Sequence, residues 1–275
     1  TFLDTVTSFD NEGALNIAKA HLAANVWDGS SYGASARSAV ILMRRDYQMT
    51  ADERYNNIAQ VQGNIIIDLG GYKLTAPKDR SLFAVSIKPW GGSGDKAIFP
   101  SEFKFVNGDI TLINSTLLTL DAWTGETGRP DDYVKDKYMS FTFENIDFSV
   151  TGTSKTLVAY ALSGTPDAFA YTDTVFNNCT FDITGAKDGF TLFNVGNGKV
   201  HNSIKVTGGE IIGGTAAPQY NAETKKYTYG LGGAVQIAGT FRMYGGSITG
   251  GQAAKGGGIY VSKNGKLTIT GGTVT

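Results

Sequence analysis

Apolar and polar residues along the chain follow a pattern that returns at a nearly regular interval. The pattern reads apolar, any residue, Gly or Asn, any two residues, apolar, and its copies occupy residues 69–74, 105–110, 143–148, 176–181, 206–211, 243–248 and 269–274. The Gly or Asn stands at positions 71, 107, 145, 178, 208, 245 and 271, so the intervals are 36, 38, 33, 30, 37 and 26 residues. Repetition on this scale is typical of proteins built from stacked repeats.

Each repeat is predicted to contain strands on both sides of a bend. Alternation precedes most of the Gly or Asn positions, as in "KFVNG" and "FTFEN", and a two-residue period is typical of a strand with one buried face. Gly and Asn tolerate the left-handed backbone, so each of these positions predicts a bend. Further strands are expected between bends, as in "LFAVSI" (82–87) and "FTLFNV" (190–195).

No repeat buries its apolar side alone, so successive repeats are expected to stack with their strands paired in parallel, about 4.8 Å apart. The sequence therefore predicts an all-β fold, a right-handed parallel β-helix (a solenoid), over residues 61–275. The chain shows no capping segment at its C-terminal end, and we expect the β-helix to be truncated there and the natural protein to continue past Thr275.

Residues 1–60 depart from the repeat and are predicted to form an N-terminal cap together with the first rungs. The stretch "NEGALNIAKAHLAANV" (11–26) places apolar residues at helical spacing, which predicts an amphipathic helix. A helix at this position would cover strand edges and core at the end of the solenoid. "SAVILM" (38–43) and "NIIIDL" (64–69) are the expected first rungs.

Composition and charge exclude several classes of function. The formal net charge is -1, from 24 basic and 25 acidic residues, which gives no overall electrostatic attraction to nucleic acid or an anionic membrane. No apolar run approaches membrane-spanning length. The single cysteine, Cys179, excludes an internal disulfide and is expected to be a buried structural thiol. His21 and His201 lack the spacing of a ligand pair, and no pattern predicts a metal site or a cofactor.

Three segments resemble a known class of proteins: "NIIIDLGGYKLT" (64–75), "GGAVQIAGTFRMYGGSITGG" (232–251) and "GGGIYVSKNGKLTITGGTVT" (256–275). They are similar to β-helix segments of large adhesin-like bacterial surface proteins, often from gut Firmicutes, and to repeats of chlamydial polymorphic membrane proteins. The resemblance implies secretion, display at the cell surface, and a binding or spacer role. The same superfamily of folds includes pectate lyases and polygalacturonases, although the Asn-Thr-Asp, Gly-His-Gly and Trp-Ile-Asp-His segments of those enzymes are missing here.

Carboxylates two positions after the bend are the candidate catalytic groups. Asp109 and Asp147 would occupy adjacent rungs about 5 Å apart, a separation that resembles the carboxylate pair of a retaining glycosidase. Glu210 falls in the same column. The alternative is a solvated face of the solenoid. In the column before the bend, Lys205 and Arg242 would either hold an acidic sugar or act as charged gatekeepers that keep a β surface soluble.

Insertions between repeats carry the candidate binding residues, because loops on a rigid scaffold commonly carry function. Residues 88–99, 121–138 and 215–230 are such insertions, the last expected to be hairpin-like, and they contain the aromatic residues Trp90, Trp123, Tyr133, Tyr138, Tyr220, Tyr227 and Tyr229. Exposed aromatic rings stack on sugars or on partner proteins. The alternative is that these rings pack against the flank of the solenoid.

Two functions follow from these observations. The preferred one is a non-catalytic domain of a secreted or cell-surface-attached bacterial protein that binds a polysaccharide or a host surface protein through its loops. The other is a carbohydrate-active enzyme, a polysaccharide lyase or glycoside hydrolase, that uses Asp109, Asp147 and Glu210.

Overall fold

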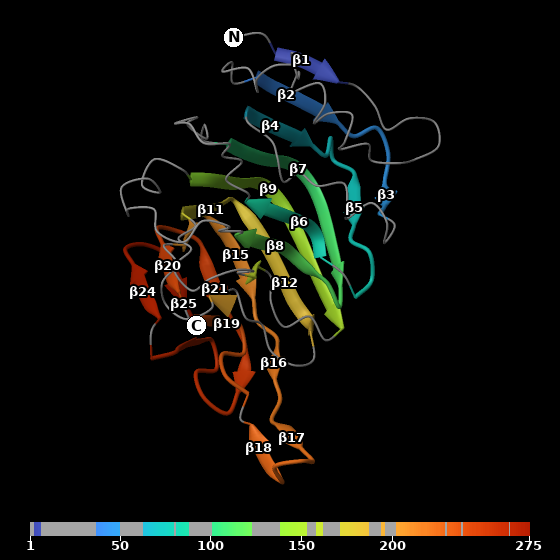
Figure 1. The fold of residues 1–275 in the computed structure, drawn as a ribbon. Coiled ribbons are helices and arrows are strands. Elements are labelled where there is room, and N and C mark those ends of the chain that lie inside the picture. The colour runs from blue at the N-terminus through green and yellow to red at the C-terminus, as the bar shows by residue number, and fades with distance from the viewer. Residues whose placement is uncertain are drawn as a thin grey trace, which may run out of the picture.

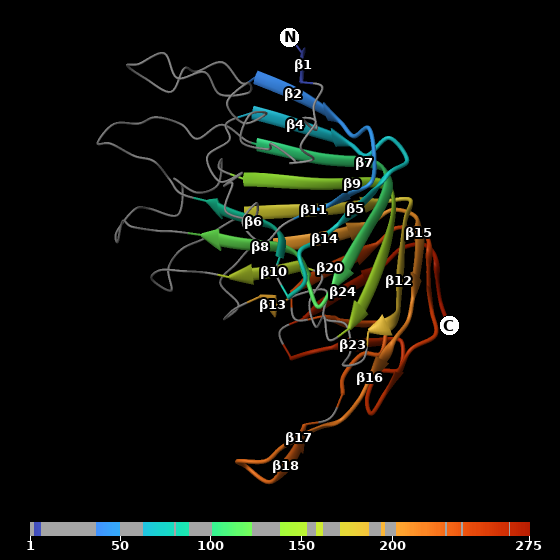
Figure 2. The same ribbon diagram turned by 90° about the vertical axis from the view of Figure 1, so that its right-hand side faces the viewer.

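The structure of the chain, a computed structural model (Figure 1), is an all-β solenoid. It describes residues 3–6, 37–49, 63–79, 81–87, 101–122, 138–152, 158–161, 171–186, 194–195, 202–228, 230–237, 239–263 and 265–275. Within these ranges the regular structure is β-strand throughout, and strands far apart in sequence lie side by side along one axis (Figure 2).

The first face of the solenoid is a run of parallel strands that spans the described chain. Its order is β1 (Leu3–Val6), β2 (Arg37–Leu42), β4 (Gly63–Asp68), β7 (Ser101–Ile113), β9 (Tyr138–Gly152), β11 (Tyr171–Asn177), β14 (Asn202–Val206), β20 (Thr240–Met243) and β24 (Lys266–Ile269). β2 and β4 lie where the first rungs are expected. The predicted helix at residues 11–26 lies outside the described residues.

The second face follows the bend and belongs to the same sheet. It contains β3 (Tyr47–Gln48), β5 (Lys73–Thr75), β12 (Cys179–Ala186), β15 (Gly209–Ile212), β21 (Ser247–Thr249) and β25 (Thr273–Val274). β7 and β9 are long enough to pass through the bend and pair on both faces. Their continuity joins the two faces into one sheet of 15 strands.

Shorter strands complete the rungs. A four-stranded parallel sheet contains β6 (Ser81–Ile87), β8 (Thr116–Ala122), β10 (Val158–Ala161) and β13 (Asn194–Val195). Two further parallel pairs are β16 (Thr215–Ala216) with β22 (Gln252–Ala253), and β19 (Val235–Ile237) with β23 (Ile259–Val261). The antiparallel pair among the described strands is β17 (Gln219–Asn221) with β18 (Lys226–Thr228).

Stacked phenylalanine rings fill the interior between the first two faces. Phe143 stacks on Phe105 and on Phe176, with ring centroids 4.8 and 5.1 Å apart. Phe148 meets Phe143 edge-on at 5.6 Å, so the columns of the two faces interlock. All these rings are buried. Each contributes roughly 1.5–3 kcal/mol before conformational entropy is subtracted, and each covers the ring of the neighbouring rung.

The predicted column after the bend is confirmed in full by the strand register. Its members pair strand by strand in the order Lys73, Asp109, Asp147, Thr180, Glu210, Ser247 and Thr273. The residue that follows each of the first six, from Leu74 to Ile248, is buried or faces the core. The alternation of the sequence therefore identified the outer and inner sides of this face.

The column before the bend, three positions ahead of each Gly or Asn, is confirmed except at its first member, Asp68; the other members pair in the order Lys104, Thr142, Val175, Lys205, Arg242 and Thr268. Leu69 and Phe105 are equivalent in the sequence template, but Phe105 pairs with Ile67 and Val106 pairs with Asp68. The bend between β4 and β5 is two residues longer than the bend within β7, because Lys73 again pairs with Asp109. The additional residues belong to the turn at Gly70 and Gly71, which have φ of 61° and 81°.

The bends use Asn and Gly in two different ways. Asn107, Asn145 and Asn178 have φ of 60°, 54° and 51°, so each predicted Asn bend is left-handed as expected. In the last three copies, which have two glycines at 208–209, 245–246 and 271–272, the left-handed residue is the second one, as at Gly209 with φ of 85°. The predicted position at Gly208 is thus wrong by one residue, because a pair of glycines lets the chain turn one step later.

The last described rung is covered by neighbours on one side. Ile269 and Val274 are 41% and 42% exposed, whereas Met243 and Ile248, their partners on the preceding rung, are 1% and 0% exposed. The same apolar position in the repeat is therefore buried or half-exposed according to whether another rung lies beyond it.

Candidate functional site

The hairpin of β17 and β18 is an insertion that the solenoid does not require. The rungs on either side of it match: Ala216 pairs with Ala253, and Leu231 forms a bridge with Lys255. Between these matched points one rung has the 14 residues 217–230, and the next rung has Ala254 alone. The shorter connection stacks in register without the hairpin, so packing of the rung does not account for the additional residues.

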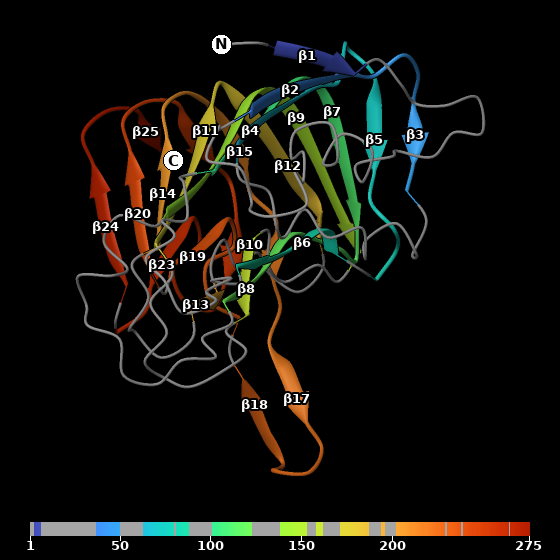
Figure 3. The same cartoon turned by 45° about the horizontal axis from the view of Figure 1, so that its top comes forward.

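Two tyrosines stand on one side of this hairpin, which projects away from the body of the solenoid (Figure 3). Tyr220 and Tyr227 are directly opposite each other, with ring centroids 5.0 Å apart and ring planes 52° apart. They are 55% and 64% exposed. The structure thus supports the exposed alternative for these two residues and not packing against the solenoid flank.

The turn of the hairpin is held by hydrogen bonds and by one left-handed residue. The Asn221 Oδ1 accepts bonds from the backbone N–H groups of Glu223 and Thr224, both at 2.9 Å. Lys225 has φ of 51° and reverses the chain toward β18. A turn bonded in this way loses less conformational entropy when a ligand binds to the tyrosines.

The other candidate binding residues are not placed by the structure. Trp90, Trp123, Tyr133 and Tyr229 lie outside the described residues. Tyr138 begins β9, and its side chain also lies outside the described part of the chain. The structure therefore brings together two of the predicted aromatic residues, Tyr220 and Tyr227.

The structure brings Asp109 and Asp147 together on the outer side of the second face. The two residues are direct partners on β7 and β9, which places them one strand spacing, about 4.8 Å, apart. Lys73 is the partner of Asp109 on the other side. Glu210 is separated from Asp147 by Thr180 and accepts a hydrogen bond from the Thr249 hydroxyl at 3.1 Å. Two of the three predicted carboxylates are thus neighbours.

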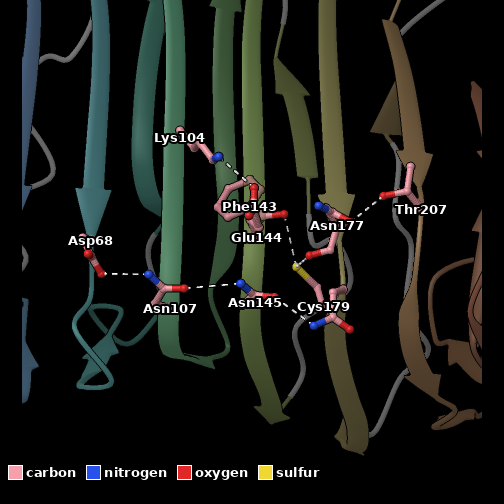
Figure 4. Close-up of polar contacts among 10 residues, drawn as sticks. Asp68, Lys104, Asn107, Phe143, Glu144, Asn145, Asn177, Cys179 and Thr207 are labelled. Atoms are coloured by element: carbon pink, nitrogen blue, oxygen red, sulfur yellow. Dashed lines mark hydrogen bonds and ion pairs between the residues drawn. The ribbon is translucent and has the colours of Figure 1, made fainter.

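An asparagine ladder runs along the bend (Figure 4). The Asn178 side-chain N–H donates to the Asn145 Oδ1 at 2.8 Å, and Asn145 donates to the Asn107 Oδ1 at 3.3 Å. Asn107 in turn donates to the Asp68 Oδ1 at 3.3 Å. Asn at these positions predicts the bends, because Asn tolerates a left-handed backbone, but a bend alone does not predict the ladder. The sequence signal for the ladder is that three successive bends carry an amide side chain, which can both donate and accept a hydrogen bond.

Cys179 lies beneath the ladder and is buried. Its thiol donates to the Phe143 carbonyl oxygen at 3.3 Å and to the Asn177 carbonyl oxygen at 3.5 Å (Figure 4). Burial raises the pKa of Cys179 from 9.0 to about 12, so the thiol stays protonated at neutral pH. A protonated, buried thiol is not a nucleophile, and the prediction of a structural cysteine is confirmed.

Metal and membrane signals are missing from the residues that the structure describes. Over those ranges, no group of three or more His, Cys, Asp or Glu side chains is arranged to hold a metal ion. No helix in the same ranges is long and apolar enough to cross a membrane. Comparisons of the chain with protein-family models, with curated proteins and with solved structures found no match.

Proposed function

We propose that the chain is a non-catalytic domain of a secreted or cell-surface bacterial protein, an adhesin-like right-handed β-helix that binds a glycan or a host protein through inserted loops. The observation that carries this proposal is the β17–β18 hairpin, with its exposed pair Tyr220 and Tyr227, inserted where the next rung has a single alanine.

Physical chemistry supports binding at these rings. Two exposed tyrosines on a projecting hairpin leave apolar ring surface in water, at a cost that contact with a ligand would remove. Each ring offers a face to a sugar or an apolar side chain, and each hydroxyl offers a hydrogen bond. Few rotatable bonds and a hydrogen-bonded turn keep the entropic cost of binding low.

The chain supplies the control for testing this proposal. Replacing residues 217–230 with one alanine copies the connection of the next rung and removes the hairpin. Binding to a glycan array and to host surface proteins is measured for the wild type, for this deletion and for Tyr220→Ala/Tyr227→Ala. We expect both variants to lose binding and to keep the unfolding midpoint of the wild type within a few degrees. Undiminished binding by both would contradict the proposal.

A carbohydrate-active enzyme is the second candidate, and the Asp109–Asp147 pair favours it. The two residues are direct partners on adjacent strands, and this spacing of about 4.8 Å is compatible with the roughly 5–5.5 Å that separates the carboxyl groups of a retaining glycosidase pair. Released sugars are measured over a polysaccharide panel for the wild type and Asp147→Asn. Asp182→Asn is the matched control, because Asp182 lies on the same face and its carboxylate is bonded to Thr184. Products lost in Asp147→Asn alone would replace the first proposal with this one.

A further inference from the structure

Charge is strongly segregated along the chain, although the net charge is close to zero. Residues 1–223 contain 18 basic and all 25 acidic residues, a net charge of -7, whereas residues 224–275 contain 6 basic and no acidic residues, a net charge of +6. The rungs from β19 onward therefore form a basic end of the solenoid. Lys225 and Lys226 belong to the hairpin, and the other four cations of this stretch lie on the rungs from β19 onward: Arg242, Lys255, Lys263 and Lys266.

On the first face, lysines of the earlier rungs have carboxylate partners. Lys104 on β7 forms an ion pair with Glu144 at 2.7 Å. Lys205 on β14 lies 3.8 Å from the Asp173 carboxylate, which also accepts a hydrogen bond from the Ser203 hydroxyl. The charges on this part of the face are thus balanced within the chain.

The pairing stops at β20. Arg242 is the direct neighbour of Lys205 in the register, and Lys266 on β24 is the neighbour of Thr240. Across the described ranges no carboxylate forms an ion pair with Arg242 or Lys266. Two like charges on adjacent strands repel each other, and none of the described carboxylates offsets the charge of Arg242 and Lys266 by an ion pair.

An exposed tyrosine lies beside these cations. Phe241 and Met243 are buried, so Arg242 projects outward from β20, and Tyr244 follows directly after the last residue of this strand. Two residues of chain span at most about 7 Å. Tyr244 is 49% exposed, and Thr268 lies next to Arg242 on the following strand. Cations, an aromatic ring and a hydroxyl are thus within one short stretch of surface.

We propose that the outer face of β14, β20 and β24 binds an anionic polysaccharide. Arg242 and Lys266 hold its carboxylate or sulfate groups, Arg242 by paired N–H donors, and the ring of Tyr244 stacks on a sugar. A charged gatekeeper against edge-to-edge pairing is the alternative role of a cation on a β face. It does not explain Arg242, because β20 lies between β14 and β24.

The test measures binding of the full chain to polygalacturonate, dextran sulfate and uncharged dextran by isothermal titration calorimetry. Binding to either charged polymer and not to dextran is expected, and the polymer that binds identifies carboxylate or sulfate as the group recognised. The double variant Arg242→Gln/Lys266→Gln should weaken binding at least tenfold and reduce its salt dependence. Tyr244→Ala should weaken binding with the salt dependence unchanged, and Lys104→Gln, the matched control, should bind as the wild type does.

Several outcomes would overturn the proposal. One is equal binding of dextran and dextran sulfate, and another is no binding of either charged polymer. A third is a folded double variant that binds the charged polymer as tightly as the wild type does. The fourth is binding of poly(dT) as tight as that of the charged sugars. The last result would make the face a general polyanion surface. Removal of residues 217–230 should leave polyanion binding unchanged, so failure of this site and failure of the hairpin proposal are distinguishable.

Discussion

Phe148 stacks face to face on Phe181, with ring centroids 4.7 Å apart and ring planes 5° apart. The two residues occupy the same position of successive repeats and are direct partners on β9 and β12. Because each ring is buried, Phe148→Ala or Phe181→Ala leaves a cavity that the neighbouring rungs cannot fill. We expect each substitution to lower the free energy of unfolding by about 3–5 kcal/mol, measured by chemical denaturation.

The control for this prediction is the neighbouring residue in the sequence. Asp147 precedes Phe148 and is exposed on the outer side of the sheet, so Asp147→Asn should change the free energy of unfolding by less than about 0.5 kcal/mol. Equal effects of Asp147→Asn and Phe148→Ala would show that the column is not a core.

Asn145 stands at the centre of the asparagine ladder and combines two properties. Its amide donates to Asn107 and accepts from Asn178, and its φ of 54° is left-handed. Asn145→Ala loses both hydrogen bonds and places a Cβ in this conformation, so we expect a loss of about 2 kcal/mol in the free energy of unfolding. Asn145→Gly loses the bonds but accepts the backbone, so about 1 kcal/mol is expected.

The order of these two variants is the decisive result, and thermal and denaturant unfolding both measure it. If Asn145→Gly were as damaging as Asn145→Ala, the left-handed backbone would contribute nothing and the ladder alone would account for the asparagine. If both variants matched the wild type, the ladder would be a consequence of stacking with no energetic role.

The periodic pattern of the sequence predicted the strands and the outer column of the second face. This succeeded because a shift of one residue would move Phe148 to the solvent side and Asp147 into the core, at a cost of several kcal/mol. Register was therefore specified wherever apolar and polar residues alternate on both sides of a bend.

The same pattern failed where the backbone, not the side chain, decides the structure. Leu69 fits the template, but the Gly70–Gly71 turn accommodates two additional residues, and no apolar position records that insertion.

Among the candidate sites, the adjacency of Asp109 and Asp147 followed from the period. The pairing of Tyr220 with Tyr227 required the hairpin register, which depends on local turn geometry at Asn221 and Lys225.

The two glycines of one bend should respond differently to substitution. A Cβ on Gly209 would lie 2.0 Å from the Cys179 carbonyl oxygen, and its φ is 85°. A Cβ on Gly208 would lie 3.6 Å from its nearest neighbour, the Asn178 backbone nitrogen. We expect Gly209→Ala to lower the free energy of unfolding by more than about 3 kcal/mol and Gly208→Ala by less than about 1 kcal/mol. Similar losses, measured by urea unfolding, would contradict the left-handed assignment of the second glycine.

Cys179 should make the stability of the protein decrease at alkaline pH. Burial raises the pKa of its thiol from 9.0 to about 12, so between these values the unfolded chain loses a proton that the folded chain retains. The contribution of the protonated thiol is complete below about pH 9 and is lost as the pH rises toward 12, at about 1.4 kcal/mol per pH unit.

Other tyrosine and lysine groups also titrate in this range, so the measurement is a comparison with Cys179→Ala. This variant removes the thiol and its bond to the Phe143 carbonyl oxygen, and at pH 7 it should be less stable than the wild type by about 1–2 kcal/mol. From pH 8.5 to 10.5 the stability of the wild type should fall by about 2 kcal/mol more than that of the variant. Parallel pH profiles for the two proteins would mean that the thiol ionises as easily in the folded chain as in the unfolded one, and that the rungs around Cys179 open to water.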